Sequence, residues 1–178
     1  MRIAVVGKSR SGKDTFAKHF IDKGFKKLAF ADGIGEIIET YFPEELSSGK
    51  PRYLYQSIGQ FFRQYDAFVW IKYLHRKLED IFNHNPDMNI IITDVRQENE
   101  AEFLRTLGFL IVKVDALESV RVQRMIAAGD QFNQESLNHD TEKQSERIAA
   151  DINILNNGTL AELFNHCDAI YKKLSGEV

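Results

Sequence analysis

Short apolar runs alternate along the chain with longer stretches in which apolar residues recur every three or four positions. The first run, Ile3 to Val6, is continuous, which is typical of a strand buried on both faces of a sheet. Further strands are expected over 28–30, 89–93, 110–114 and 152–155. This alternation predicts an α/β fold with five parallel strands, right-handed crossovers and helices on both faces of the sheet.

Helix signals fill the stretches between the strands. A helix is expected to begin at Lys13 and to end near Gly24, because glycine favours a helix stop. Further helices are expected over 34–41, 53–62, 68–81, 101–107 and 120–128. Thr159 is placed to cap the last helix. Two polar segments lack a clear period: we interpret 43–51 as a mobile loop and 129–146 as a surface lid or loop.

A phosphate-binding motif follows the first strand. Residues Gly7 to Lys13 fit the pattern G-x-x-x-x-G-K, and they stand in the required place between a buried strand and a helix. Glycines let the backbone curl so that its N–H groups point into one concavity, and the helix that follows adds its positive dipole end. Lys13 would bring a positive charge to the β- and γ-phosphates of a nucleoside triphosphate. The alternative interpretation is a plain glycine turn with a solvated lysine.

The residue after Lys13 departs from this motif, in which Ser or Thr coordinates Mg²⁺. Here it is Asp14, and Thr15 follows one position later. Asp14 could hold Mg²⁺ directly or through water, or accept a substrate proton, while Thr15 could bind a phosphate oxygen. The shift favours a kinase of a small metabolite over a GTPase switch. The sequence also has no Asn-Lys-x-Asp tetrapeptide of the kind that reads guanine.

The amino-acid composition mainly excludes some classes of protein and partner. A chain of 178 residues with 43% hydrophobic and 28% charged residues suits one globular domain and excludes disorder of the whole chain. Its 23 basic and 26 acidic residues give a net charge of −3, which argues against a duplex-DNA partner. The single cysteine, Cys167, cannot form an internal disulfide, and neither a membrane span nor a signal peptide is indicated. We expect a cytoplasmic protein without nucleic-acid or membrane partners, whose oligomeric state the sequence leaves open.

Several segments together resemble the phage-type deoxynucleoside monophosphate kinases. They are 8–15 with its Lys-Asp-Thr, Lys27 to Asp32, Ser57 to Gly59, Trp70 to Lys72, Ile92 to Glu100, His139 to Glu142 and Ile154 to Leu163. These pieces cover most of the chain in the family order. Gly33 and Gln60 depart from the family pattern and the segment between them is short, which bears on the monophosphate pocket and on base preference. Animal phosphomevalonate kinases have a similar Gly-Lys-x-x-Ser-Gly-Lys-Asp loop.

The resemblance implies a three-layer P-loop fold and Mg²⁺- and ATP-dependent phosphoryl transfer to a (deoxy)nucleoside monophosphate, giving the diphosphate. It implies one kinase domain over 1–178, with an acceptor-binding helical segment at about 33–86 and a lid at about 121–146 that closes to exclude water. Two alternatives stay open. One is a kinase of another small phosphorylated metabolite, such as phosphomevalonate or dephospho-coenzyme A, and the other is a nucleotide-binding regulatory module that hydrolyses slowly.

Candidate site residues follow from the motif, from the resemblance and from the rule that parallel sheets bind ligands beyond the carboxyl ends of their strands. We expect the nucleotide to be bound by Gly7, Lys8, Arg10, Ser11, Gly12, Lys13, Asp14, Thr15 and Asn157. The expected catalytic residues are Lys13, Asp94, Arg121 and Arg124. Those expected to bind the acceptor are Asp32, Arg63, Phe68, Trp70 and Arg96. Asp14 and Thr15 are the candidate Mg²⁺ ligands.

Structural alternatives stand beside some of these roles. Asp94 could cap the helix that follows it, and Arg96 could form an ion pair with Glu98 or Glu100. Arg121 and Arg124 are three residues apart and share one helix face, so they could form a basic surface stripe. The resemblance also assigns His139 and Glu142 to the lid.

Overall fold

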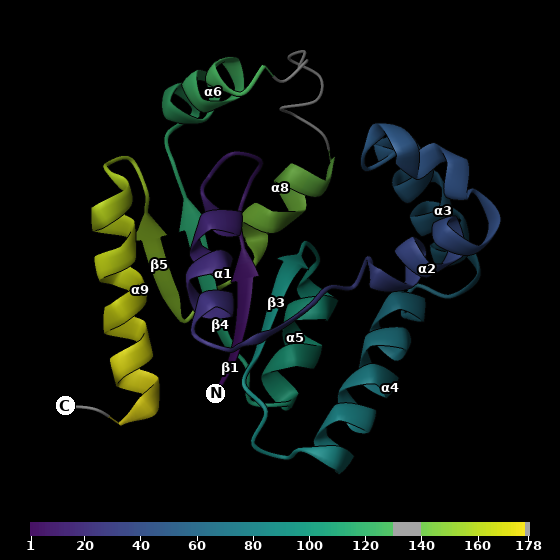
Figure 1. Cartoon of the computed structure of the whole chain (residues 1–178), viewed down its shortest axis with the longest axis horizontal. Helices are drawn as coiled ribbons and strands as arrows, with labels where there is room; N and C mark the ends of the chain where they lie inside the picture. Colours follow the sequence, from purple (N-terminus) through teal and green to yellow (C-terminus); the bar gives the residue numbers. More distant parts are fainter. Residues whose placement is uncertain (130–139, 177–178) are drawn as a thin grey trace. The chain divides into compact units, whose positions relative to one another are not determined.

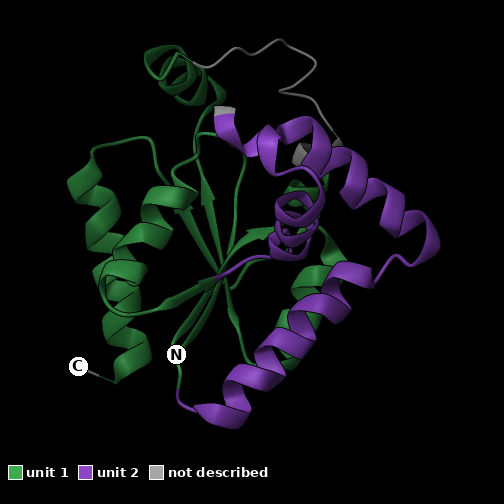
Figure 2. Cartoon of the chain, turned by 45° about the vertical axis from the view of Figure 1, so that its right-hand side comes forward, with its two compact units in different colours: residues 1–27, 88–178 green, residues 28–87 purple. Residues whose placement is uncertain are grey.

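The chain divides into two compact units (Figure 2). The computed structural model describes residues 1–129 and 140–176. Unit 1 comprises residues 1–27 and 88–178, and unit 2 comprises residues 28–87. The phosphate-binding motif therefore belongs to unit 1, and the segment 33–86, for which acceptor binding is expected, lies within unit 2.

A five-stranded parallel sheet forms the centre of unit 1 (Figure 1). Its strands are β1 (Arg2–Val6), β2 (Lys26–Leu28), β3 (Ile90–Val95), β4 (Leu110–Asp115) and β5 (Ile152–Leu155), in the order β2-β3-β1-β4-β5. β1 lies in the middle, where Ile3 pairs with Ile91 on one side and with Leu110 on the other. The predicted number of strands and the predicted parallel sheet are confirmed.

Helices cover both faces of this sheet. The helices of unit 1 are α1 (Lys13–Asp22), α5 (Glu98–Thr106), α6 (Glu118–Ala127), α8 (Asp140–Arg147) and α9 (Leu160–Ser175). Ile3 and Val5 pack with α1 and α9 in one core cluster that includes Phe16 and Cys167. Ala4 is equally buried and points to the opposite face, because side chains alternate along a strand. Burial on both faces explains why β1 is apolar throughout, and it gives the three-layer arrangement expected from the sequence.

Unit 2 is helical. It consists of α2 (Asp32–Tyr41), the 3₁₀ helix η1 (Pro43–Ser48), α3 (Arg52–Tyr65) and α4 (Val69–His84). Gly33 lies where α2 crosses α4, and a Cβ there would press on the rings of Tyr73 and Trp70. The indole Nε1 of Trp70 donates a hydrogen bond of 3.1 Å to the carbonyl of Gly59, which links α4 to α3.

Three local expectations differ from the structure. The segment 43–51 contains η1 rather than only a loop, because Pro43 stands at the start of a helical turn and the Ser47 hydroxyl bonds back to the carbonyl of Glu44. The second strand ends at Leu28 and not at residue 30, because the Asp32 carboxylate accepts the Ala29 N–H at 2.8 Å and the chain turns into α2. Both differences come from a local hydrogen bond that ends or begins an element.

The third difference concerns the polar segment 129–146. Its final part forms α8, where a loop is predicted, whereas residues 130–139, including His139, lie outside the described residues. Lys113 donates to the main-chain carbonyl of Glu146 at 2.9 Å, and Lys8 forms an ion pair with the Glu146 carboxylate. These tertiary contacts stabilise a short polar helix that has too little apolar periodicity to be predicted. Within the described ranges, no helix is both long enough and apolar enough to cross a membrane.

The packing of α1 on α9 includes a charged cluster at its edge. Asp168 Oδ1 lies 2.9 Å from His19 Nε2 and 3.3 Å from Lys23 Nζ. The hydrogen bond with His19, followed by the one with Lys23, holds the pKa of Asp168 below its ordinary value. The ionised carboxylate therefore stabilises the folded state, since the unfolded chain releases this proton only at a higher pH.

We predict that Asp168→Asn lowers the Tm at pH 7, and that the difference from the wild type disappears as the pH falls through the lowered pKa. The reason is that a depressed carboxyl pKa stabilises the fold above its unfolded value of about 3.9 and loses this effect below the folded value. Thermal unfolding followed from pH 7 to pH 3 measures this. Asp22→Asn, which breaks an exposed pair with Lys18 on α1, is the matched control. A Tm loss of equal size at pH 3 and pH 7 would contradict the prediction.

Candidate functional site

The phosphate-binding loop between β1 and α1 has a backbone that few residue types can adopt. Gly12 has φ +103° and Arg10 has φ +60°, both in the left-handed region. A Cβ on Gly7 would clash with the carbonyl of Val114, so only glycine fits beside β4. The Ser11 N–H donates to the carbonyl of Lys8 at 3.2 Å, which closes the loop on itself. Among the described residues no side chain caps the start of α1, whose first amides have no acceptor within the helix.

Three consecutive residues at the start of α1 carry the polar groups of the motif. The Lys13 side chain is largely buried, with 17% of it exposed, and its Nζ lies 3.8 Å from Asp14 Oδ2. The Asp14 side chain is 87% exposed, and Thr15 is exposed beside it. The lysine is therefore held near the loop, whereas the carboxylate and the hydroxyl are open to solvent. No group of three or more His, Cys, Asp or Glu side chains suited to a metal occurs among the residues that the structure describes.

The two arginines of α6 contact the main chain of the loop. Arg121 is 3% exposed, and its Nη1 lies 3.5 Å from the carbonyl of Ser9. Arg124 Nη1 lies 3.3 Å from the carbonyl of Arg10 and 3.4 Å from that of Ser11. Arg121 and Arg124 therefore do not form a basic surface stripe. Both guanidinium groups lie against the phosphate-binding loop.

Asn156, which is not among the site residues expected from the sequence, also contacts this loop. It directly follows β5 and is 7% exposed, and its Nδ2 donates to the carbonyl of Ser11 at 2.8 Å. The main-chain carbonyl of Asn156 accepts a hydrogen bond of 3.0 Å from Arg124 Nη2. The neighbouring Asn157, selected from the sequence, instead accepts the N–H of Leu117 at 2.8 Å and joins two connecting loops. The only sequence signal for Asn156 is its place at the end of β5.

A cavity of about 420 Å³ opens beside these groups. Its walls are Arg10, Gly12, Asp14, Thr15, Arg124, Asn156, Gly158, Thr159, Leu160 and Leu163. The volume falls within the range of small-molecule sites. Thr159 caps α9 through a capping box with Glu162, which fixes the wall formed by the start of that helix. Of the sequence-selected nucleotide-binding residues, Arg10, Gly12, Asp14 and Thr15 line this cavity and Asn157 does not.

Lys8 has an acidic partner in this structure. Its ammonium forms an ion pair with Glu146 on α8, and the Lys8 side chain is 22% exposed. The hydrogen bond and charge of Lys8 hold the pKa of Glu146 below its ordinary value. Any anion that binds Lys8 here therefore competes with a carboxylate that stays ionised at neutral pH.

At the end of β3, the structure excludes helix capping as the role of Asp94. Asp94 is half-buried in the strand, and Gln97 rather than Asp94 caps α5, in a capping box with Glu100. The main-chain N–H of Arg96 donates to Glu100 at 2.8 Å, while Arg96 itself is exposed. Helix capping thus does not account for Asp94.

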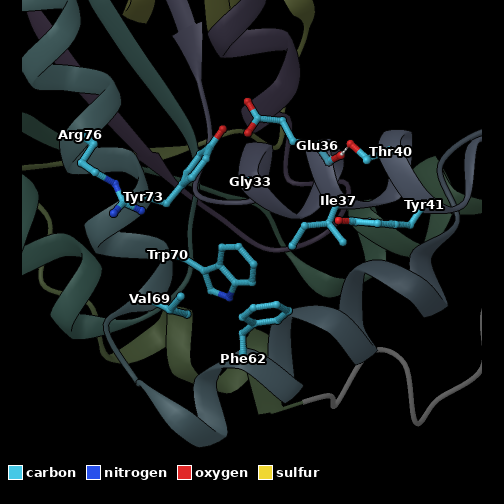
Figure 3. Close-up of a pocket in the computed structure, with 10 residues that line it drawn as sticks. All are labelled: Gly33, Glu36, Ile37, Thr40, Tyr41, Phe62, Val69, Trp70, Tyr73 and Arg76. Carbon is cyan, nitrogen blue, oxygen red and sulfur yellow. Dashed lines mark hydrogen bonds between the residues drawn. The ribbon is translucent and has the colours of Figure 1, made fainter.

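Unit 2 contains a second cavity, of about 330 Å³, which Figure 3 shows with its lining side chains. The walls are Gly33, Glu36, Ile37, Thr40, Tyr41, Phe62, Val69, Trp70, Tyr73 and Arg76. We call it the aromatic cavity. Phe62 and Trp70 lie on one side of it with ring centroids 5.6 Å apart. Of the acceptor-binding residues selected from the sequence, Trp70 lines it, whereas Asp32, Arg63 and Phe68 lie elsewhere in the unit.

A charged group is fixed in the wall of the aromatic cavity. Lys77 binds the Glu36 carboxylate at 2.5 Å, and this hydrogen bond, with a smaller contribution from the nearby Tyr73 hydroxyl, lowers the pKa of Glu36. In Figure 3 the Tyr73 hydroxyl points toward the Glu36 carboxylate. Burial, with a smaller contribution from Glu36, raises the pKa of Tyr73. At neutral pH the cavity therefore presents an ionised carboxylate, a neutral phenol and the guanidinium of Arg76 around an apolar floor.

We predict that Gly12→Ala weakens ATP binding by about tenfold or more, because the new Cβ would clash with Asn156 Nδ2 in a backbone with φ +103°. Gly24→Ala is the matched control: Gly24 has φ +90°, but no atom lies within 4 Å of the added Cβ. Both variants carry similar backbone strain, and only Gly12→Ala disturbs the loop. Calorimetry with Mg-ATP measures the difference. Equal affinities of the two variants for ATP would contradict the prediction.

Comparison with known proteins identifies the family. A family model for deoxynucleotide monophosphate kinase matches residues 52–167. A predicted deoxynucleotide monophosphate kinase from Acanthamoeba polyphaga mimivirus is 27% identical over 192 aligned positions, which cover 92% of this chain and 92% of that protein. These matches confirm the resemblance drawn from the sequence.

Two solved kinases share the fold of this chain. Shikimate kinase from Acinetobacter baumannii superimposes with a TM-score of 0.60 at 16% identity, covering 99% of this chain and 94% of that chain. Dephospho-CoA kinase from Campylobacter jejuni gives a TM-score of 0.51 at 14% identity, covering 97% and 96%. The P-loop fold is thereby confirmed, and with the family match it makes the chain a nucleotide or small-metabolite kinase. It belongs to the deoxynucleotide monophosphate kinase family of P-loop phosphotransferases.

Proposed function

We propose that this protein transfers the γ-phosphoryl group of ATP, with Mg²⁺, to a (deoxy)nucleoside monophosphate and so forms the diphosphate. The observation that carries the proposal is the contact of two α6 guanidinium groups, Arg121 and Arg124, with the main chain of the phosphate-binding loop. Phosphoryl transfer needs little covalent chemistry from the protein, and its barrier falls mainly through positioning and charge neutralisation. A loop of amides flanked by arginines supplies both.

The ATP donor is assigned to unit 1. The amides at the start of α1 and the Lys13 ammonium would bind the phosphates, and the cavity lined by Arg124, Asn156 and Leu160 would receive the nucleoside. Asp14 and Thr15 are exposed on the cavity wall and suit Mg²⁺, which proteins commonly hold through one or two carboxylates together with substrate phosphates. When bound, this ion would neutralise charge on the phosphate oxygens.

Arg121 and Arg124 can exchange their loop carbonyl partners for phosphate oxygens during the proposed reaction. The bonds from Arg121 and Arg124 Nη1 to loop carbonyls are long, at 3.3–3.5 Å. A phosphate oxygen accepts a shorter and stronger, charge-assisted bond from a guanidinium than a neutral carbonyl does. We assign both arginines, with Lys13, to neutralisation of the transferring group, where an arginine typically contributes about 10³–10⁵ in rate.

The base of the acceptor is assigned to unit 2. We propose that the aromatic cavity receives the base, because Phe62, Trp70 and Tyr73 offer ring faces for a flat heterocycle. Arg63 keeps its proposed place among the acceptor-binding residues of unit 2. In unit 1, Arg96 is proposed to bind a substrate phosphate, and Asp94 to orient that phosphate or a water on Mg²⁺. Asp32 and Phe68 keep their proposed place in the acceptor site, although one Asp32 oxygen already accepts the Ala29 N–H.

We expect acceptor-dependent release of ADP with nucleoside monophosphates and none with phosphomevalonate or dephospho-coenzyme A. A coupled ADP-release assay over the common nucleoside and deoxynucleoside monophosphates and these two metabolites measures it. Turnover with one of the two metabolites alone would replace the proposed acceptor. Tight ATP binding without turnover on any acceptor would instead identify a regulatory nucleotide-binding module.

Lys13→Ala is the control for this assay. Loss of the ammonium should lower kcat by at least about a hundredfold, since it removes charge neutralisation at the transferring phosphate. The circular dichroism spectrum and the Tm should stay close to those of the wild type. Phosphoryl transfer at a near-normal rate in this variant would refute the assignment of the loop.

Trp70, which lines the aromatic cavity, is the single tryptophan of the chain, so its fluorescence reports on this cavity alone. We predict that nucleoside monophosphates change the Trp70 emission to a similar extent in the wild type and in Lys13→Ala. Phe62→Ala should weaken this titration by about tenfold, as for loss of one base-stacking ring. Phe42→Ala is the control, since Phe42 in unit 2 is 40% exposed, close to the 38% of Phe62, but does not line the cavity. Equal titration curves of the two phenylalanine variants would place the base elsewhere.

A further inference from the structure

Asn156 joins three segments of unit 1 that are far apart in the sequence. Its main-chain N–H donates to the carbonyl of Asp115 at 2.7 Å, which extends the pairing of β5 with β4 by one residue. Its main-chain carbonyl accepts from Arg124 on α6. Its side-chain Nδ2 donates to the carbonyl of Ser11 in the phosphate-binding loop. The backbone is thus fixed by the sheet, and the side chain reaches the loop from a rigid base.

The side chain of Asn156 is packed as well as hydrogen-bonded. The residue is 7% exposed, and its Nδ2 lies so close to Gly12 that a Cβ there would clash with it. Ser11 is 0% exposed, so its carbonyl needs a partner inside the protein. Asn156 supplies that partner at 2.8 Å, and Arg124 adds a longer contact at 3.4 Å. Asn156 therefore supplies the shorter of the two hydrogen bonds that this buried carbonyl accepts.

The hydrogen bond from Asn156 to the Ser11 carbonyl also fixes the orientation of the peptide group between Ser11 and Gly12. The peptide between Ser11 and Gly12 is planar and trans, as are all the peptide bonds of the described chain. In a trans peptide the C=O and the N–H point in opposite directions. Because the Ser11 C=O points at Asn156, the Gly12 N–H points away from Asn156. A rotated peptide would exchange a donor for an acceptor at the place where phosphate oxygens bind.

We propose that Asn156 is a positioning residue that aims the Gly12 N–H at the donor phosphates and ties this orientation to Arg124. This inference rests on the proposed binding of ATP to unit 1. An aspartate at position 156 has the same shape but only acceptors at neutral pH, so it would repel the Ser11 carbonyl. The loss should therefore fall on polyphosphate binding in general, independent of the base that the phosphates carry.

The test compares Asn156→Asp and Asn156→Ala with the wild type by calorimetry, using inorganic tripolyphosphate and ATP as separate ligands. Both variants should bind both ligands at least about tenfold more weakly, because the buried Ser11 carbonyl loses the shorter of its two hydrogen bonds. Asn153→Asp makes the same change at an exposed site on β5 and should bind both ligands like the wild type. Tripolyphosphate and ATP affinities within twofold of the wild type in either folded Asn156 variant would overturn the inference.

A second measurement does not depend on the variants being folded. In ¹⁵N-labelled wild-type protein, tripolyphosphate should move the Gly12 amide proton strongly downfield, because that N–H gains a charged acceptor. If tripolyphosphate binds and the Gly12 signal stays in place, the inference is wrong even though the ATP site stands. If the wild type binds neither tripolyphosphate nor ATP, the proposed function itself fails.

Discussion

The carbonyl groups of the phosphate-binding loop set the constraint on which the rest of the site depends. A loop that turns its N–H groups inward must turn carbonyls outward, and buried carbonyls need donors. The Ser11 N–H bonds to the Lys8 carbonyl within the loop, and the other donors come from outside it: Arg121 and Arg124 on α6, and Asn156 after β5. The parallel sheet brings these elements together, because the loops at the carboxyl ends of β1, β4 and β5 meet at one edge. The shape of the loop is thus a property of unit 1 and not of its own sequence alone.

This arrangement gives the arginines two tasks. Arg124 bonds to the carbonyls of Arg10, Ser11 and Asn156, of which Ser11 and Asn156 are buried residues. In the proposed reaction the same guanidinium would exchange a long bond to a neutral carbonyl for a shorter one to phosphate. Lys8 would likewise exchange its ion pair with Glu146 for one with a bound anion. Cationic groups that already have moderate partners can be held in place without blocking the ligand that binds them more strongly.

Unit 2 provides a different environment. Its aromatic cavity combines ring faces with groups of both charges, Glu36 and Arg76, and Lys77 keeps the carboxylate ionised. The ring faces of this cavity are the basis for proposing it as the site of the acceptor base.

The sequence by itself determined the elements and the phosphate-binding loop. Continuous apolar runs predicted five strands, helical spacing predicted most helices, and G-x-x-x-x-G-K located the loop, because these signals come from residues close together in the chain. The tertiary structure decided what long-range contacts control. It formed α8 through Lys8 and Lys113, and it brought Phe62, Tyr73 and Glu36 from three helices into one cavity. It also made Asn156 rather than Asn157 the partner of the loop, because neighbouring residues at a strand end point in different directions and only the packed sheet fixes which one faces Ser11.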